Sequence, residues 1–268
     1  MTTRTDVTPN LCMDQARYAA NKEAVYDYDA GKRYSFAELH ERAERVAAFL
    51  TEELHLKKGD RVAFLSENAM PFLDVFFSGY KTGVIMTSFN CMLGAEEILR
   101  TVELEDPSVI FFSNAQRALA ERLRADARRE RIHIALAEGP GRHDHIYDDV
   151  VNYAPKGNAV YDPPAPEDVQ MLIHTGGTTG EPKSAMMSYR AIYYNATSEI
   201  LSWHLGYGDS ALVVLPFFHT AGWNVLMLPM LLAGGRVILT ASFDPEKTLK
   251  IFREERPTTN IGVETIYK

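Results

Sequence analysis

A polar, glycine-rich segment in the second half of the chain holds the residue types best suited to chemistry. It runs from His174 to Ser184, reads HTGGTTGEPKS and follows a mostly apolar run. Glycines let backbone N–H groups approach an anion without obstruction by a side chain, and successive N–H groups in such a turn form an anion-binding nest. Threonine hydroxyls add donors, and the lysine adds a full positive charge. The segment therefore predicts a polyphosphate-binding loop made of Thr175, Gly176, Gly177, Thr178, Thr179, Gly180 and Lys183.

Two common phosphate-binding motifs do not describe this loop. A Walker A loop needs adjacent Gly and Lys followed by Ser or Thr, whereas Gly180 and Lys183 are separated by two residues. The glycine spacing of the dinucleotide-binding fingerprint is also absent. Glycine-rich composition by itself would favour a flexible surface turn. The ordered run of threonine, glycine, proline and lysine favours the phosphate loop instead.

A second segment, Leu215–Trp223, brings proline, aromatic residues, histidine and glycine together in the order LPFFHTAGW. Taken alone, His219 is expected to be a structural histidine at the start of a helix. Trp223 is expected to be a core residue, as tryptophans in apolar helices usually are. We assign this segment a function only because the predicted phosphate loop lies a short distance before it in the sequence.

The loop resembles the phosphate-loop signature of the adenylate-forming superfamily, which includes acyl- and aryl-CoA synthetases, peptide-synthetase adenylation domains and beetle luciferases. Gly176 replaces the commonest serine, a variant associated with the acyl-CoA synthetase branch. Ser184 replaces the usual glycine after the lysine, which would alter the backbone path there and weaken phosphate binding. The positions that match the signature are Thr175, Gly177, Thr178, Thr179, Gly180, Pro182 and Lys183.

The histidine segment is similar to a segment of the same superfamily that borders the acyl pocket. The resemblance implies that His219, Trp223 and Asn224 contact the substrate. A fainter match lies at residues 262–265, where relatives usually have proline in place of Glu264.

The resemblance implies a two-step reaction with ATP, Mg²⁺ and coenzyme A. A carboxylate would attack the α-phosphate of ATP to give an acyl-adenylate and pyrophosphate, and a thiol would then take the acyl group. Between Ala211 and Gly235 there is no basic residue, which favours a hydrophobic or aromatic acid. Two alternatives stay open: delivery of the acyl group to a carrier-protein thiol, and a non-catalytic nucleotide- or acyl-binding module.

Alternating short strands and helices predict the α/β fold class, with largely parallel sheets flanked by helices. Ser35 with Glu38 predicts a capping box, and Asn68 and Asp244 are expected to cap later helices. The irregular stretch 138–168 predicts a connection between two subdomains, residues 1–160 and 161–268. Strands are predicted at 62–65, 84–87, 109–112, 132–136, 169–174, 211–215, 236–240 and from 260, and helices at 36–54, 68–81, 94–104, 115–129, 188–201, 221–232 and 245–253.

Composition narrows the possible partners and locations of the protein. The 268 residues carry a formal net charge of −8, so nucleic acid is a poor candidate for a partner. Two cysteines without metal-ligand or disulfide spacing predict a cytoplasmic protein. The apolar stretch 211–239 contains two prolines and a glycine pair, which predicts a strand, a loop and a buried helix instead of a membrane span.

The superfamily's motifs for adenine, ribose, a metal-binding glutamate and the catalytic lysine are expected downstream of Lys268. The sequence therefore predicts a fragment without its carboxy-terminal domain, without a catalytic or metal-binding residue of its own, and inactive by itself. Whether it forms a homodimer is left open.

Overall fold

The computed structural model describes residues 9–125, 129–175 and 183–266, and these form two compact units. The first unit contains residues 42–66 and 71–189, and the second contains 9–41, 67–70 and 190–266. This division differs from the expected one at residue 160. The physical reason is strand pairing. Strands β8 (Val169–Thr175) and β9 (Lys183–Ser188) extend the sheet of the first unit, and the early strands β1 (Glu23–Asp27) and β2 (Lys32–Ser35) extend that of the second.

The first unit is built, in its described part, on a seven-stranded sheet with the order β7-β6-β5-β3-β4-β8-β9. Neighbouring strands are parallel except β8 and β9, which are antiparallel. The interior strands are short apolar runs, as expected for strands covered on both faces. The strands are β3 Arg61–Leu65, β4 Ile85–Ser88, β5 Val109–Phe112, β6 Ile132–Ala135, β7 His145–Ile146, β8 Val169–Thr175 and β9 Lys183–Ser188.

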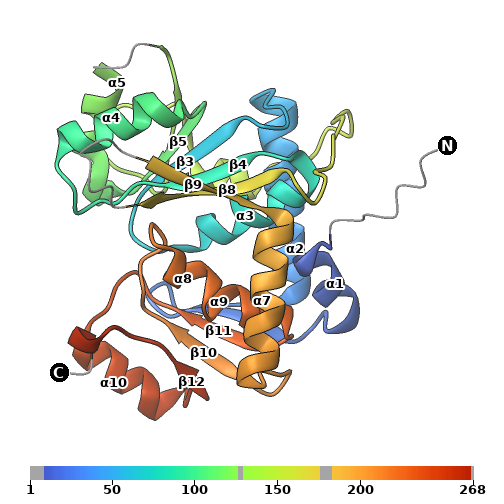
Figure 1. The fold of residues 1–268 in the computed structure, drawn as a ribbon. Helices are drawn as coiled ribbons and strands as arrows, with labels where there is room; N and C mark the ends of the chain where they lie inside the picture. Colours follow the sequence, from blue (N-terminus) through green and yellow to red (C-terminus); the bar gives the residue numbers. More distant parts are fainter. Residues whose placement is uncertain (1–8, 126–128, 176–182, 267–268) are drawn as a thin grey trace. The chain divides into compact units, whose positions relative to one another are not determined.

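Helices cover both faces of this sheet (Figure 1). Helices α4 (Ala95–Glu105) and α5 (Arg117–Ala125) lie on one face, and α3 (Met70–Thr82) lies on the other. On the α3 face, Phe72 stacks on Phe64 with ring centroids 3.9 Å apart. On the α4 face, the core consists of Ala63, Leu65, Phe89, Ile98, Val102, Ile110, Phe112, Ala120, Leu123 and Ala135. The remaining helical elements are α6 (Tyr147–Val151), the 3₁₀ turn Asn114–Gln116 and the π-helical turn Phe49–Glu53 that continues α2 (Phe36–Ala48).

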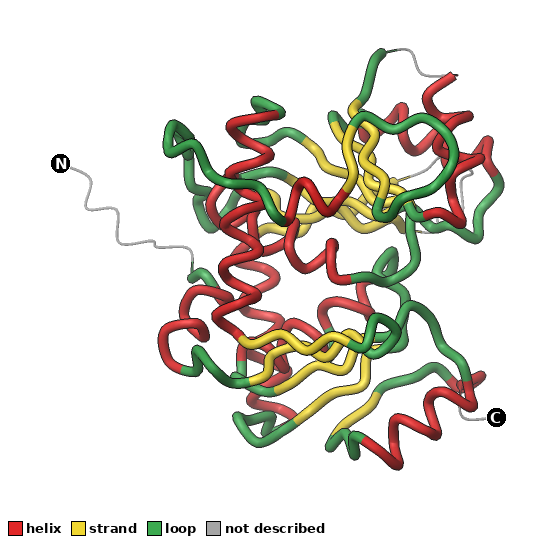
Figure 2. Tube along the Cα trace, turned by 180° about the vertical axis from the view of Figure 1, so that it is seen from behind, coloured by secondary structure: helices red, strands yellow, loops and turns green. Residues whose placement is uncertain are grey.

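The second unit has a smaller sheet with the order β12-β10-β11-β1-β2 among its described strands (Figure 2). Here β1 pairs in parallel with β11 and antiparallel with β2. The strands are β1 Glu23–Asp27, β2 Lys32–Ser35, β10 Ser210–Val213, β11 Arg236–Leu239 and β12 Thr259–Asn260. The helices are α1 Leu11–Tyr18, α7 Tyr189–Trp203, α8 Thr220–Asn224, α9 Met227–Leu232 and α10 Pro245–Glu254, followed by the 3₁₀ turn Glu264–Ile266.

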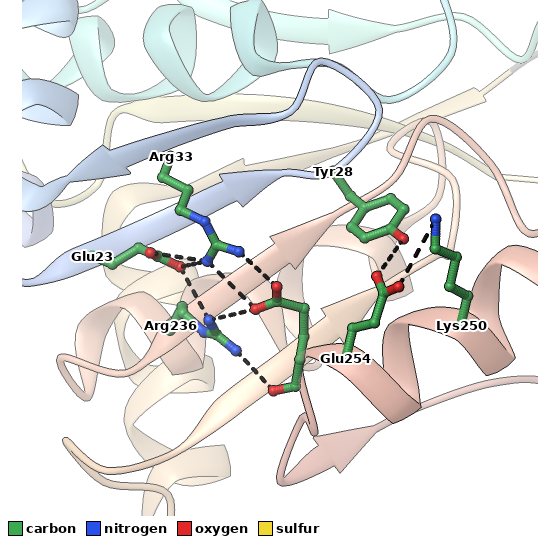
Figure 3. Close-up of polar contacts among 7 residues, drawn as sticks. Glu23, Tyr28, Arg33, Arg236, Lys250 and Glu254 are labelled. Carbon is green, nitrogen blue, oxygen red and sulfur yellow. Dashed lines mark hydrogen bonds and ion pairs between the residues drawn. The ribbon is translucent and has the colours of Figure 1, made fainter.

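A charged cluster joins four elements of the second unit (Figure 3). Arg33 of β2 contacts Glu255, just after α10, at 2.6 Å and Glu23 of β1 at 3.0 Å. Arg236 of β11 contacts the same two carboxylates at 2.9 and 3.1 Å. Beside it, the Tyr28 hydroxyl donates to Glu254, which also faces Lys250. Alternating charges therefore connect strands that are far apart in the sequence.

Most predicted elements are confirmed, and the local capping chemistry is as expected. Ser35 and Glu38 form the capping box, with the Ser35 N–H donating to the Glu38 carboxylate at 2.7 Å and the Glu38 N–H donating to the Ser35 hydroxyl at 3.2 Å. Asp244 caps α10 by accepting from the Lys247 N–H at 2.7 Å. Asn68 instead contacts the backbone of the second unit, as described below.

Several details of the prediction are wrong. The connection 138–168 contains β7 and α6, and the strands β1, β2 and β9 were not predicted. The predicted helix 221–232 is two short helices, α8 and α9. Pro229 explains the break, because proline has no N–H to donate to the carbonyl four residues earlier and its ring crowds that carbonyl.

The stretch 211–239 is divided between strands and short helices, as predicted. In the described part of the chain, no helix is long and apolar enough to cross a membrane.

Candidate functional site

The predicted phosphate loop connects the antiparallel strands β8 and β9. Thr175 is the last residue of β8, Lys183 is the first of β9, and the two are direct partners in the ladder. The Thr175 hydroxyl donates to the Lys183 carbonyl at 3.3 Å. Thus the hairpin holds the first and last predicted binding residues side by side. The other five predicted residues lie outside the described part: Gly176, Gly177, Thr178, Thr179 and Gly180.

A buried carboxylate lies beside the base of this hairpin. Glu105, the last residue of α4, has a side chain only 2% exposed. Its carboxylate accepts from the Thr87 hydroxyl of β4 at 2.8 Å and contacts the His174 Nε2 atom of β8 at 2.7 Å. It also accepts from the Ser184 hydroxyl of β9. One carboxylate therefore connects three adjacent strands.

The electrostatics of Glu105 follow from these partners. Burial opposes its ionisation, but hydrogen bonds from His174, Ser184 and Thr87, with the charge of His174, outweigh that effect and lower the pKa of the carboxyl. The ring of His174 also stacks on Phe89, with centroids 5.5 Å apart. We conclude that Glu105 is held as an anion inside the first unit.

A groove runs along β8 and β9 on the same side of the sheet as Glu105. Its volume is about 720 Å³, and Lys183 and Ser184 are among its lining residues. The other lining residues are Arg61, Ile85, Leu104, Glu105, Val169, Leu172 and Met186. Lys183 therefore borders open space beside the loop.

The histidine segment lies in the second unit, between β10 and α9. His219 is exposed and is the N-cap of α8, where its Nδ1 atom accepts from the Ala221 N–H at 3.2 Å. Because Nδ1 accepts, the proton of the neutral ring is on Nε2. Gly222 packs so closely that a Cβ atom there would lie 2.5 Å from the Pro216 carbonyl oxygen. Any side chain at this glycine would displace the segment.

Trp223 and Asn224 are both buried. The indole of Trp223 is 0% exposed, donates to the Phe217 carbonyl at 2.8 Å and packs on the Phe217 ring at 4.5 Å. The Asn224 amide donates to the Thr220 hydroxyl at 2.9 Å, while its Oδ1 atom is buried without a hydrogen-bond partner. His219 is therefore accessible to a ligand, whereas Trp223 would act through its neighbours.

Asn68 braces this segment from another part of the chain. Its amide donates to the carbonyls of Leu215 at 2.9 Å and Thr240 at 3.3 Å, and its carbonyl accepts from the Phe217 N–H at 2.8 Å. Each contact satisfies a backbone group just after a strand. The expectation that Asn68 caps α3 missed this role.

The described residues hold no group of three or more His, Cys, Asp or Glu side chains arranged for a metal ion.

The family model described as AMP-binding enzyme matches residues 12–268, almost the whole chain. The chain belongs to this family. It is the adenylate-forming superfamily that the loop resembles, and the chain corresponds to its amino-terminal portion.

Curated relatives and solved structures agree with the family. The chain is 30% identical to a feruloyl-CoA synthase from Amycolatopsis sp. over 254 residues, which is 95% of this chain and 48% of the relative. It is 29% identical to an indoleacetate–CoA ligase from Aromatoleum aromaticum over 231 residues, covering 85% of this chain and 44% of that one. The chain thus spans about half the length of the curated relatives it matches.

The fold is that of solved members of the family. ATP-bound MatB from Rhodopseudomonas palustris superposes with a TM-score of 0.80 at 26% identity, covering 96% of this chain and 50% of that one. The inhibitor-bound N-terminal domain of FACL13 from Mycobacterium tuberculosis superposes with a TM-score of 0.82 at 23% identity. The match covers 98% of this chain and 64% of that one.

Sequence reasoning missed Glu105 and Asn68 as site-supporting residues. A signal existed for Glu105, because a carboxylate in the last turn of a helix faces the negative end of the helix dipole. Such a residue needs compensating donors. Asn68 gave no comparable signal, since asparagine before a helix is usually a cap.

Proposed function

We propose that the complete protein containing this sequence is an AMP-forming acid–thiol ligase that activates a carboxylic acid with ATP and transfers the acyl group to coenzyme A. The observation that carries the proposal is the β8–β9 hairpin, which brings Thr175 and Lys183 together at the two ends of the signature loop. The family match over residues 12–268 supports it. So do the names of the relatives, which are CoA synthases and ligases.

The chemistry begins with attack by a carboxylate oxygen on the α-phosphorus of ATP. The bond to the β-phosphate oxygen breaks and pyrophosphate leaves, so negative charge builds on the departing group. Lys183, exposed at the start of β9, would stabilise that charge, as preorganised cations do in such sites. A thiolate then attacks the acyl carbon and AMP leaves. Mg²⁺ would neutralise phosphate charge when bound with ATP.

We propose a hydrophobic or aromatic acid as the substrate. The segment around His219 is apolar, and no basic residue between Ala211 and Gly235 is available to pair with a second carboxylate. Relatives named for ferulate and indoleacetate are in keeping with this class. His219 and Asn224 are proposed to border the acyl group, with Trp223 supporting the wall from behind. The two cysteines, which lack disulfide or metal-ligand spacing, fit a reducing compartment such as the cytoplasm.

The test is a panel assay on the complete protein with Mg²⁺, ATP, coenzyme A and aliphatic or aromatic acids. We expect acyl-CoA and AMP with at least one hydrophobic acid, and acid-dependent exchange of pyrophosphate into ATP without coenzyme A. Exchange without acyl-CoA would indicate a carrier-protein thiol as acceptor. The absence of both products and exchange would contradict the enzyme proposal and favour a binding module. The 268 residues alone, which cover about half of the relatives, are expected not to complete the reaction.

A further inference from the structure

The residues on either side of the phosphate loop are joined through one buried side chain. His174 precedes Thr175, Ser184 follows Lys183, and the two are partners in the β8–β9 ladder. Side chains on one strand alternate between faces, and direct partners share a face. His174 and Ser184 therefore point to the same side of the sheet, where both contact the Glu105 carboxylate.

We propose that Glu105 is a positioning residue that ties both ends of the phosphate loop to helix α4, and that Ser184 is the part of this tether that aligns Lys183. The inference rests on the proposed ATP-dependent function and deepens it. Ser184 occupies the position where the phosphate-loop signature has glycine, which has no side chain for such a contact. The tether through residue 184 thus belongs to this chain's own version of the loop, and it gives Ser184 the opposite role to the weakening of phosphate binding expected from the sequence.

The position of Glu105 means that its carboxylate requires several hydrogen-bond donors. It is the last residue of α4, where the helix dipole disfavours an anion, and its side chain is nearly fully buried. An ionised carboxylate in such a place is stable only with several donors. Two of its three donors come from the strands that carry the loop. Loss of either one would destabilise the anion and release one strand of the hairpin from its contact with α4.

Ser184 is adjacent to Lys183, so its side chain fixes the backbone from which the lysine extends. The antiparallel hairpin alone already orients Lys183 through its pairing with Thr175. However, β9 is the edge strand of the sheet and pairs only with β8 among the described strands. The hydrogen bond from Ser184 to Glu105 adds a contact between β9 and α4 that lies outside the ladder.

The third donor offers a matched control. Thr87 on β4 gives one hydrogen bond to the same carboxylate at 2.8 Å, but β4 carries no residue of the loop. Thr87→Val keeps the side-chain shape and removes that donor. It therefore reproduces the loss of a hydrogen bond to Glu105 without releasing the hairpin.

The experiment compares four variants of the complete protein: Ser184→Ala, Ser184→Thr, Glu105→Gln and Thr87→Val. Calorimetry measures the Kd for MgATP without acid, hydrogen exchange measures protection of the β8 and β9 amides, and thermal unfolding gives Tm. We expect Ser184→Ala and Glu105→Gln to weaken MgATP binding about 3- to 10-fold, as the loss of one neutral to charge-assisted hydrogen bond implies. Exchange at the ends of β8 and β9 should accelerate in both. Ser184→Thr, which keeps the hydroxyl, should bind MgATP within about twofold of wild type.

Thr87→Val should lower Tm about as much as Ser184→Ala but leave the Kd for MgATP within about twofold. If Thr87→Val and Ser184→Ala weakened MgATP binding equally, Glu105 would contribute only to stability, and the inference would be overturned. Wild-type affinity and wild-type hairpin exchange in Ser184→Ala would overturn it as well. A wild-type protein that activates no acid would contradict the proposed function alone, because the exchange comparison of the variants still decides the tether.

Discussion

Lys183 is exposed at the beginning of a strand, and its backbone pairs with Thr175 in the β8–β9 ladder. Such a position gives the ammonium group freedom to reach a ligand while its Cα atom is held in place. Residues of this kind contribute little to the folded core. Their effect is expected on ligand affinity instead.

Lys183→Ala should weaken ATP-dependent activity about 10- to 150-fold, because a charge-assisted hydrogen bond contributes roughly 1.5–3 kcal/mol. Tm should change little. The measurement is kcat/KM for ATP together with a melting curve on the complete protein. Lys57→Ala, at another exposed lysine of the same unit, is the control and should leave both unchanged. Wild-type kinetics in Lys183→Ala would rule out the phosphate role.

Trp223→Ala should lower the free energy of unfolding by about 3–5 kcal/mol, since the indole is fully buried and leaves a cavity. If that cavity joins the acyl pocket, as proposed, preference in kcat/KM should move toward longer acids by several-fold per added methylene, each worth about 0.8 kcal/mol. A chain-length profile of the folded variant measures this. An unshifted profile with the stability loss would assign Trp223 to the core alone.

The part of the candidate site that can be predicted from residue types alone is the phosphate loop. Glycines, threonines and Lys183 indicated phosphate before any fold was known. Glu105 could not be found this way, because its role depends on strand pairing that brings His174 and Ser184 to one side of the sheet. The burial of Trp223, in contrast, was expected from its place in an apolar segment.

At the scale of elements, the loop is followed by a strand and not by a helix. In a Walker A loop, the N-terminus of a helix supplies free N–H groups and part of a positive charge to the phosphates. The described hairpin has no such helix at the residues that close the loop. Lys183 and the loop's own groups must therefore supply a larger share of the attraction to an anion.

The charged cluster of the second unit predicts a pH-dependent stability. Hydrogen bonding from Arg33 lowers the pKa of Glu255, burial opposes this, and Arg236 adds to the lowering. A carboxyl whose pKa is lower in the folded state stabilises the fold above its unfolded pKa of about 4.3 and loses that contribution as pH falls through the folded value. Glu255→Gln should therefore destabilise the unit by about 1–2 kcal/mol at pH 7, and by progressively less below about pH 4.

Denaturant unfolding at several pH values measures this difference. Glu254→Gln is the matched control, because Glu254 is half exposed and its contact with Lys250 is 3.9 Å long. It should change stability by less than about 0.5 kcal/mol at any pH. A pH-independent difference for Glu255→Gln would contradict the ionic role.

Elements with strong periodicity were predictable, and marginal strands were not. Strand β5 is a run of four buried apolar residues and was predicted at its observed bounds. Strand β9 is an edge strand of mixed exposure, and β2 is the polar sequence KRYS. Their strand conformation comes from pairing with β8 and β1, which local sequence does not encode.

At the scale of the whole molecule, the chain leaves the second unit early and returns to it late. Val62 of the first unit pairs with Val109, whereas Val25 of the second pairs with Val237. The chain that joins β1 to β11 is longer than the chain that joins β3 to β5, so closing it costs about 1 kcal/mol more in conformational entropy. Contacts between residues distant in sequence also form more slowly.

The first unit should therefore fold before the second. In refolding from denaturant, pulse-labelled amides of β3 and β5 should gain protection earlier than those of β1 and β11. Mass spectrometry of labelled peptides measures the order. Simultaneous protection of all four strands would show that the two units fold as one cooperative body.

The same pairing has a consequence for the newly made chain in a cell. Glu23 and Arg236, which meet in the charged cluster, are 213 residues apart. At about 5–20 residues per second of synthesis, roughly 10–40 s separate the emergence of β1 from that of β11. During that interval β1 has left the ribosome without its partner β11, so the edge it will later share with β11 is unpaired, a state prone to joining other chains. Chaperones that shield unpaired edges should accordingly raise the yield of soluble protein, and slower translation should make that help more important.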